Sequence, residues 1–360
     1  MNAMTRNVII VGAGPAGLGQ ALALKRAGIP DVLILDARGI GASFRAWPQE
    51  TRLLTPSFPS QAYGCPDLNS VFPEASPADR FVCEHISGPQ YADWLNQEAR
   101  RAGLDVACPV HVKAVDREDG LFELDTDQGM FRCRVLVWAT GEFFFPSRHE
   151  YPGAELCVHY ADVKSWRDCE GDQLLVIGGA ESGIDAACNL IALGKKVTVL
   201  DRGGAWMEEQ GDPSLVLSPH TRTRFRAALD SGRLRMVPDV SVVRVGDHGD
   251  GFRVYGQDGQ SFACDGPPIS CIGFVGGASQ IRDLWAWRNG QVLLTPEDES
   301  TLTPGLFLAG PQVRQPGEIF CFIYKFRTRF DIVCHAISQR LRENESVPHL
   351  ESFASHASGV

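Results

Sequence analysis

The feature that most constrains this chain is a glycine-rich turn between an apolar strand and a helix, and it occurs twice. In the first copy, residues 7–11 are an apolar run of strand type, residues 12–17 read Gly-Ala-Gly-Pro-Ala-Gly, and apolar residues then recur at helical spacing. Residues 31–36 form a second apolar strand that ends on a carboxylate. Strand, turn, helix and strand make a βαβ unit, the building block of a parallel sheet.

The second copy follows the same order. Residues 173–177 are strand-like, residues 178–183 read Gly-Gly-Ala-Glu-Ser-Gly, and a helical pattern leads to a strand over residues 196–201. Two such units in 360 residues suit two domains of ordinary size. We therefore predict an α/β fold with two Rossmann-like, doubly wound domains.

The remaining segments set the predicted domain boundaries. A strand over residues 134–137 leads into an Ala-Thr-Gly turn and three phenylalanines, which is a sharp exit from a sheet. Later strands over residues 268–272 and 306–309 are each followed by glycine, and a final helix is expected from Ile319. The chain thus returns to its first domain after the second. The predicted ranges are 1–150 and 273–345 for the first domain, 151–272 for the second, and 346–360 for a flexible tail.

Composition disfavours several function classes. A net charge of −10 and a pI near 5.4 argue against nucleic acids and anionic membranes as partners, because binding to either depends on lysine and arginine. No apolar run approaches the ~18 residues of a spanning helix, and we expect neither membrane insertion nor a secretory segment. The eleven cysteines are scattered, with no C-x-x-C pair and no regular metal-ligand spacing, which favours a cytoplasmic protein without a metal site.

The first glycine turn has the residues of a dinucleotide site. Gly12 permits the tight turn, Gly14 lets the backbone approach a pyrophosphate, and Gly17 lets the helix pack on the strand. The phosphates would lie at the helix N-terminus, and Asp36 would accept hydrogen bonds from ribose hydroxyls. The alternative is a glycine turn that only packs helix against strand.

The second turn departs from this pattern, because Ala180 stands where the middle glycine is usual and its methyl group intrudes on the approach to a pyrophosphate. Asp201 ends the following strand and favours the free 2′-hydroxyl of NADH over the 2′-phosphate of NADPH. The adjacent Arg202 favours the opposite choice. We predict a second dinucleotide site here and leave both coenzymes open.

These elements resemble the two-dinucleotide-domain flavoproteins, the group that includes thioredoxin reductases and flavin-containing monooxygenases, over residues 7–343. In that group the first glycine motif binds FAD, the second binds NAD(P)H, and an Ala-Thr-Gly turn marks the crossing between domains. This chain has that turn at residues 139–141 and the late strand ending in glycine at residues 305–310. The resemblance implies FAD and either NADPH or NADH as cofactors, with the NAD(P)H domain inserted in the FAD domain. Pro311 is a departure, because the group usually has an aspartate there.

The resemblance also implies which residues bind the cofactors. Within the FAD set, Val112 would offer its backbone to adenine, and Thr55 would lie near the flavin ring. The predicted FAD positions are Gly12, Gly14, Pro15, Ala16, Gly17, Asp36, Ala37, Ser43, Phe44, Trp47, Thr55, Val112, Ala139, Thr140, Gly141 and Gly310. The predicted NAD(P)H positions are Gly178, Gly179, Ala180, Glu181, Ser182, Gly183, Asp201 and Arg202.

Within the group, the absence of a C-x-x-C pair separates this chain from thioredoxin reductases. Residues 41–48, 53–57 and 324–327 instead resemble small bacterial flavin-containing monooxygenases of the CzcO-like kind. The monooxygenase fingerprint F-x-G-x-x-x-H is altered, because Gly153 and His159 are six positions apart. The resemblance implies oxygenation of a soft sulfur or nitrogen nucleophile, with O2 and a small-molecule substrate as partners, and it leaves homo-oligomerisation open.

Two residues are candidates for a direct part in the chemistry. Thr55 could bond the polar edge of the flavin, and its alternative is a turn residue before Pro56. Cys321 is expected at the start of the final helix, where the positive helix end would lower a thiol pKa, and its alternative is a buried core cysteine. A reactive Cys321 would favour a reductase of a low-molecular-weight disulfide, a quinone or another acceptor. A flavin-bound redox sensor or regulatory partner without turnover is the third reading.

Two clusters have both a functional and an ordinary interpretation. Three basic residues of the final helix could meet a phosphate or an acidic substrate, although a solvated face is the simpler expectation; they are Lys325, Arg327 and Arg329. The aromatic residues could shape a substrate pocket between the domains or fill the core; they are Trp166, Trp285, Trp287 and residues 143–145.

Overall fold

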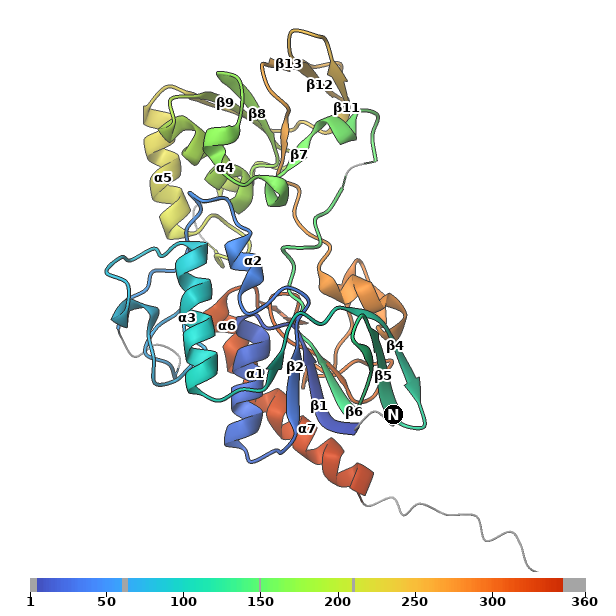
Figure 1. The fold of residues 1–360 in the computed structure, drawn as a ribbon. Coiled ribbons are helices and arrows are strands. Elements are labelled where there is room, and N and C mark those ends of the chain that lie inside the picture. Colours follow the sequence, from blue (N-terminus) through green and yellow to red (C-terminus); the bar gives the residue numbers. More distant parts are fainter. Residues whose placement is uncertain (1–4, 60–63, 149, 209–210, 346–360) are drawn as a thin grey trace, which may run out of the picture.

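The computed structural model describes residues 5–59, 64–148, 150–208 and 211–345, and its strands gather in two main sheets (Figure 1). The first sheet has seven strands, in the order β3-β2-β1-β6-β5-β4 with β17 beside β6. Its strands are β1 (Thr5–Val11), β2 (Val32–Leu35), β3 (Val106–Ala107), β4 (Val112–Glu118), β5 (Leu121–Thr126), β6 (Gly129–Trp138) and β17 (Leu306–Leu308). We call the part of the chain built on this sheet the first domain.

The second sheet has five strands in the order β10-β9-β8-β14-β7, and all its pairings are parallel. Its strands are β7 (Val158–His159), β8 (Gln173–Ile177), β9 (Lys196–Leu200), β10 (Leu234–Val237) and β14 (Ile269–Ser270). A three-stranded antiparallel sheet accompanies it, formed by β11 (Val242–Asp247), β12 (Phe252–Gly256) and β13 (Ser261–Cys264). We call this part the second domain.

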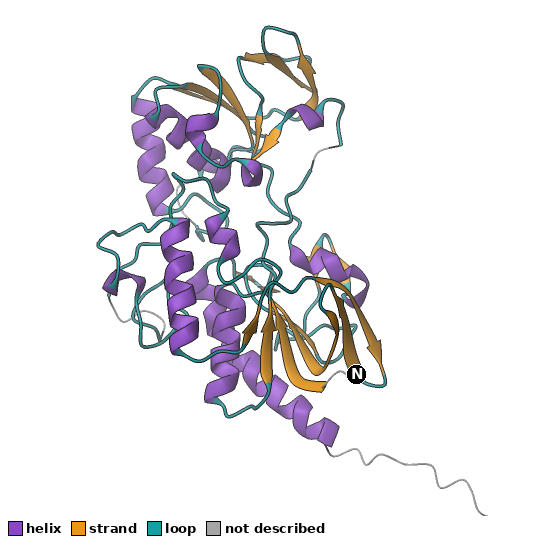
Figure 2. Cartoon of the chain, viewed as in Figure 1, coloured by secondary structure: helices purple, strands orange, loops and turns teal. Residues whose placement is uncertain are grey.

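Helices lie against both sheets (Figure 2). The helices are α1 (Pro15–Arg26), α2 (Ala42–Arg45), α3 (Gly88–Arg101), α4 (Glu181–Ala192), α5 (Pro219–Asp230), α6 (Ile323–Phe326) and α7 (Phe330–Glu345). β1 pairs in parallel with β2 and with β6, and β8 pairs in parallel with β9 and with β14. Both predicted βαβ units are therefore present, and the predicted α/β class is confirmed.

The predicted strands form because their residues are apolar on both faces, as a sheet covered on both sides requires. Val8, Ile9 and Ile10 of β1 are fully buried, and so are Leu175 and Val176 of β8. Both helices are followed by a glycine that stops them. Gly28 and Gly194 come directly after the C-cap residues of α1 and α4 and have positive φ angles of 75° and 88°, a conformation that glycine adopts without strain.

The final helix begins later than expected. Glu318–Ile319 form strand β19, which pairs with β18 (Arg314–Gln315), and this hairpin delays the helix start to Ile323. A single 3₁₀ turn at Arg327–Arg329 then separates α6 from α7. The prediction of one regular helix from Ile319 was wrong, because the hairpin uses the first of those residues.

Two linkers join the domains and run side by side (Figure 1). The Ser147 N–H donates to the Gly273 carbonyl at 3.0 Å, and the Val275 N–H donates to the Phe145 carbonyl at 2.9 Å. The crossing after β6 and the return after β14 therefore hold each other in place. The predicted tail, residues 346–360, lies outside the described residues.

Candidate functional site

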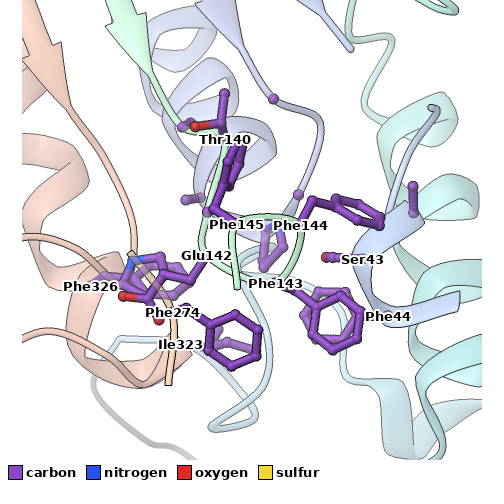
Figure 3. Close-up of a pocket in the computed structure, with 18 of the residues that line it drawn as sticks. Ser43, Phe44, Thr140, Glu142, Phe143, Phe144, Phe145, Phe274, Ile323 and Phe326 are labelled. Carbon is purple, nitrogen blue, oxygen red and sulfur yellow. The ribbon is translucent and has the colours of Figure 1, made fainter. Parts of the chain in front are cut away.

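A cavity of about 530 Å³ opens where the chain leaves β1 and β6 and enters α6 (Figure 3). This volume lies in the range of sites for small molecules and cofactors. Ligands of open α/β sheets bind outside the carboxyl ends of the strands, and this cavity has that position. Its walls come from the first glycine turn, residues 139–145, and the start of α6, with Glu181, Pro213 and Ser214 added by the second domain.

The structure brings nearly all the predicted FAD positions to this cavity. All of them line it except Gly17 and Gly310. Those two glycines pack the walls instead: a Cβ at Gly17 would lie 1.9 Å from the Gly12 carbonyl oxygen, and a Cβ at Gly310 would lie 3.0 Å from the Ala16 Cβ. The first glycine motif thus allows the helix to pack closely on the strand and also forms part of the cavity wall.

The middle of the first turn is open. A Cβ at Gly12 would lie 2.3 Å from the Ala139 carbonyl oxygen, whereas a Cβ at Gly14 would meet no atom within 4 Å. Gly14 is the N-cap of α1, and no side chain caps this helix end. Its N–H groups therefore face the cavity and can bind an anion, which is the site that a dinucleotide pyrophosphate requires. The residues present fit the phosphates of FAD.

Asp36 and Asp201 stabilise the two turns in the same way. The Asp36 carboxylate accepts hydrogen bonds from the N–H groups of Ala13, Arg38 and Gly39, each at 2.7 Å. The Asp201 carboxylate accepts from the N–H groups of Gly179, Gly203 and Gly204 at 2.7–2.8 Å. Each aspartate therefore ties its glycine turn to the loop after its own strand.

The predicted NAD(P)H positions lie at the carboxyl ends of β8 and β9, and only one of them reaches the cavity. Glu181, the first residue of α4, lines it. One carboxylate oxygen of Glu181 accepts from the N–H of Ser218, the N-cap of α5, and the other is buried without a partner among the described residues. Burial raises the pKa of Glu181, although hydrogen bonds from Thr221 and Ser218 oppose the shift.

Thr55 and Cys321, the two candidates for a direct part in the chemistry, both line the cavity. The Thr55 carbonyl accepts from the Asn69 side chain at 2.9 Å, which holds this wall segment in place. The expectation of a lowered pKa at Cys321 was wrong. Burial raises its pKa despite a hydrogen bond with Ser214 and the charges of Arg314 and Lys325, and α6 is too short to oppose burial with a strong helix dipole.

Phenylalanine side chains form much of the apolar lining of the cavity (Figure 3). The rings of Phe143 and Phe144 meet edge to face at 5.8 Å, and Phe143 lies 5.8 Å from Phe274 of the return linker. The guanidinium of Arg38 lies 4.0 Å from the Phe144 ring centroid, a cation–π contact at the rim. Phe322 and Phe326 also line the cavity.

The three tryptophans of the predicted aromatic cluster, Trp166, Trp285 and Trp287, do not line the cavity. Trp166 and Trp285 are 0% and 2% exposed, which places them in the core. The Trp287 ring N–H donates to the Arg282 carbonyl at 2.9 Å, away from the cavity. Of the predicted aromatic cluster, only Phe143, Phe144 and Phe145 line the cavity.

The three basic residues of the final helix form specific contacts, and the expectation of a solvated face was wrong. Lys325 donates to both carboxylate oxygens of Asp212 at 2.6 Å, and Arg329 pairs with the fully buried Asp298. Arg327 is 6% exposed and donates to the carbonyls of two residues in the loop around position 70. All three are used in packing, because each faces a carboxylate or carbonyl of another segment.

Two sets of contacts join the domains. Thr51 of the first domain forms hydrogen bonds of 2.9 Å with the Tyr160 hydroxyl and the Asp185 carboxylate. Lys325 of α6 binds Asp212 and Ser214 of the second domain. These contacts hold Glu181 at the cavity.

The altered fingerprint has a structural role. His159 is 1% exposed, its Nε2 lies 3.2 Å from the Gly273 carbonyl, and its Nδ1 accepts from the Ala161 N–H at 3.1 Å. The side chain therefore connects β7 to the return linker. Its ring also meets Phe274 edge to face at 5.4 Å, which connects it to the aromatic wall.

Sequence reasoning missed Glu142 and the segment around Ser214, and both line the cavity. Glu142 follows the Ala-Thr-Gly turn directly, so its position next to a predicted site was a usable signal. Nothing in the sequence around Ser214 indicated that this loop of the second domain reaches α6.

Among the described residues, no helix is both long and apolar enough to cross a membrane. In that same part of the chain, no cluster of three or more histidine, cysteine, aspartate or glutamate side chains has the arrangement of a metal site. All eleven cysteines fall within it, and all are free thiols.

Comparison with known proteins agrees with this geometry. Residues 9–310 match the family described as pyridine nucleotide-disulphide oxidoreductase. A ferredoxin–NADP reductase of Bradyrhizobium diazoefficiens is 26% identical over 333 residues, which cover 87% of this chain and 85% of that protein. Bacillithiol disulfide reductase Bdr from Staphylococcus aureus superposes with a TM-score of 0.76 at 22% identity, covering 94% and 99% of the two chains. A flavin-containing monooxygenase from Stenotrophomonas maltophilia gives 0.76 at 19% identity, covering 93% and 98%.

Proposed function

This chain belongs to the pyridine nucleotide-disulphide oxidoreductase family and is an FAD-dependent oxidoreductase that uses NAD(P)H, and from that premise we propose that it is a monooxygenase. The expected reaction is oxygenation of a soft sulfur or nitrogen nucleophile with O2. The observation that carries the proposal is the wall of the cavity, which combines phenylalanines from both linkers with a single thiol. Bound FAD supplies the chemistry, because it accepts a hydride from NAD(P)H and passes electrons to O2.

The residues of the chain have distinct tasks in this proposal. The open turn at Gly14 and the uncapped start of α1 would hold the FAD phosphates, within a domain of residues 1–150 and 273–345. The second turn, in residues 151–272, would hold NAD(P)H, and Glu181 at the start of α4 connects this turn to the cavity. Phe143, Phe144 and Phe274 exclude water from the reacting atoms, which protects an oxygenation from side reactions.

A reductase is the second candidate, and a specific observation favours it. Cys321 lines the cavity with Ser214 beside it, so a disulfide or quinone in the cavity could meet a thiol. The ferredoxin–NADP reductase relative also covers most of the chain. Burial keeps Cys321 protonated at neutral pH, which makes it a weak nucleophile and favours the oxygenase.

The test follows the fate of oxygen. The purified flavoprotein is mixed with NADPH or NADH, ¹⁸O2 and thioanisole or N,N-dimethylaniline as probe, and the organic product is analysed by mass spectrometry. The proposal expects one ¹⁸O atom in the sulfoxide or N-oxide for each coenzyme oxidised. Coenzyme oxidation that yields only hydrogen peroxide, or that requires an added quinone or disulfide, would refute oxygenation and support the reductase.

A further inference from the structure

Among the described residues of the segment between the domains, Glu142 is the one carboxylic acid that lines the cavity (Figure 3). It follows the Ala-Thr-Gly turn, and its backbone carbonyl accepts a hydrogen bond of 2.8 Å from the Phe145 N–H. This turn fixes the backbone and directs the side chain into the cavity. Phe143 and Phe145, on the same turn, line the cavity beside it.

The Glu142 carboxylate has no hydrogen bond or ion pair with any described residue. This distinguishes it from the other acids of the cavity wall: Asp36 accepts three backbone N–H groups, and Glu181 accepts from Ser218. Glu142 is partly buried, and a carboxyl without a fixed partner in such a place is costlier to keep ionised than one in open solvent. Such a group is suited to hold a proton and release it to a molecule in the cavity.

The charges around Glu142 are few. Arg314 of β18 is the cation that acts on it, and the Arg314 guanidinium donates to the carbonyls of Pro311 and Val313. Cys321, at the start of α6, is the other titratable group that interacts with it. Burial raises the pKa of Glu142, and Arg314 opposes that shift only in part.

We propose that Glu142 delivers to the cavity the proton that each turnover consumes. NAD(P)H, O2, a proton and the nucleophile give NAD(P)⁺, the oxygenated nucleophile and water, so one proton must enter for each hydride. The O–H bond of the Glu142 carboxyl breaks, its electron pair stays on the carboxylate, and the proton joins the oxygen atom that leaves as water. Solvent then protonates the carboxylate again. The inference rests on the proposed acceptor chemistry, but reduction of a quinone consumes the same proton.

The main test is Glu142→Gln, which keeps the shape of the side chain and removes the proton. Anaerobic reduction of the flavin by NADPH should change less than twofold, because a hydride carries no separate proton. The reaction of the reduced enzyme with O2 and thioanisole should slow by about 10²-fold at neutral pH, the usual effect of losing a general acid. In the unsubstituted protein this step should slow as pH rises through the Glu142 pKa, and the variant should lose that pH dependence.

Two further variants distinguish proton donation by Glu142 from a purely structural role. Glu142→Asp should restore part of the rate together with the pH dependence. Cys321→Ser removes the other titratable neighbour and should keep the pH dependence. If Cys321→Ser abolishes the pH dependence while Glu142→Gln retains it, the thiol is the donor and the proposal is wrong.

A readout without turnover completes the test. Infrared spectra of the protein, with and without FAD, should contain the C=O stretching band of a protonated carboxyl that Glu142→Gln lacks and that disappears as pH rises. Absence of that band at the pH values where the acceptor reaction is fast would overturn the proposal. Menadione serves as a second acceptor. If thioanisole is not oxygenated but Glu142→Gln still slows menadione reduction, the monooxygenase fails and the proton donor stands.

Discussion

The two glycine motifs of this protein have nearly the same skeleton. Gly12 and Gly178 begin their turns with φ angles of 113° and 107°, which favour glycine. A Cβ at Gly183 would lie 1.8 Å from the Gly178 carbonyl oxygen, just as one at Gly17 would meet Gly12. These positions are dictated by the packing of helix on strand, so they are alike whatever each turn binds.

The motifs differ where they face a ligand. The first has Gly14 and Pro15 at the helix start, whereas the second has Ala180 and Glu181. Gly14 faces open space, whereas the equivalent position of the second turn already carries the methyl group of Ala180. Gly179, the equivalent of Ala13, is covered as well, because a Cβ there would lie 2.3 Å from the Trp206 ring. The outer glycines are therefore required by the packing of helix on strand, whereas the middle position determines how closely a phosphate can approach the turn.

The largest expected effect comes from the packing glycines. Gly17→Ala should destabilise the protein by roughly 3–5 kcal/mol and abolish FAD retention, because its Cβ would overlap the Gly12 carbonyl. Gly183→Ala makes the same clash in the second domain and should abolish flavin reduction by NAD(P)H while the protein stays yellow. Flavin absorbance per protein and thermal unfolding measure both. Equal flavin loss in the two variants would contradict the assignment of one cofactor to each motif.

The middle positions should give a smaller effect. Gly14→Ala adds a methyl group in open space, so the fold should survive while the Kd for FAD rises about tenfold or more, which is ~1.4 kcal/mol or above. Ala180→Gly is the matched change and should tighten NAD(P)H binding by a few-fold at most. Titration of the FAD-free protein and of the holoprotein gives the two constants. Unchanged FAD affinity in Gly14→Ala would show that the phosphates bind elsewhere.

Much of this comparison was readable from the sequence, because strands buried on both faces and glycine turns leave a local signal. The two βαβ units and the α/β class followed from those patterns. The start of the last helix did not, because the pairing of Glu318–Ile319 with Arg314–Gln315 overrides helix propensity. Contacts between distant segments were equally hidden from local reasoning, and Lys325 with Asp212 is an example.

In the candidate site, too, features with a local sequence signal were predicted, and features that depend on distant segments were not. The residues around the first motif were predicted to bind FAD, and the structure brings them to one cavity because the turn and the ends of the parallel strands meet there. The raised pKa of Cys321 was not predicted, because burial is a tertiary property that no neighbouring residue reveals. Glu142 had a usable local signal, its position after the Ala-Thr-Gly turn, but its lack of a hydrogen-bond or ion-pair partner among the described residues becomes visible only when the segments around it are in place.

Coenzyme choice sharpens the comparison further. The Asp201 carboxylate accepts hydrogen bonds from three backbone N–H groups, as the Asp36 carboxylate does. It therefore has fewer lone pairs left to accept a hydrogen bond from a ribose hydroxyl. The next residue is Ala37 in the first domain and the exposed Arg202 in the second. Arg202→Ala should therefore raise the Kd for NADPH about tenfold, ~1.4 kcal/mol, and leave NADH unchanged. Arg288→Ala, at another exposed arginine, is the control, and an equal loss for both coenzymes would exclude recognition of the 2′-phosphate.

The smallest effect concerns the docking that lets the two motifs serve one cavity. Glu50 of the first domain accepts from the Ser165 hydroxyl at 2.7 Å and from the Trp166 N–H at 3.0 Å in the second. Burial raises the pKa of Glu50, but these hydrogen bonds together outweigh it and hold the pKa below its usual value of 4.5. A folded-state pKa below the unfolded one stabilises the protein above about pH 4.5, and this stabilisation is lost as pH falls through the folded value.

Glu50→Gln should therefore lower the free energy of unfolding by about 1 kcal/mol at pH 7, and the difference from the unsubstituted protein should disappear in acid. Urea unfolding at pH 7 and at a series of acid pH values measures it. Glu74→Gln is the control, because that carboxylate is 75% exposed in its ion pair with Arg26 and should give no measurable change. A Glu50 effect that persists unchanged in acid would mean that side-chain shape, and not charge, docks this segment. The second motif would then be held at the cavity mainly by the contacts of Thr51 and Lys325, which do not involve Glu50.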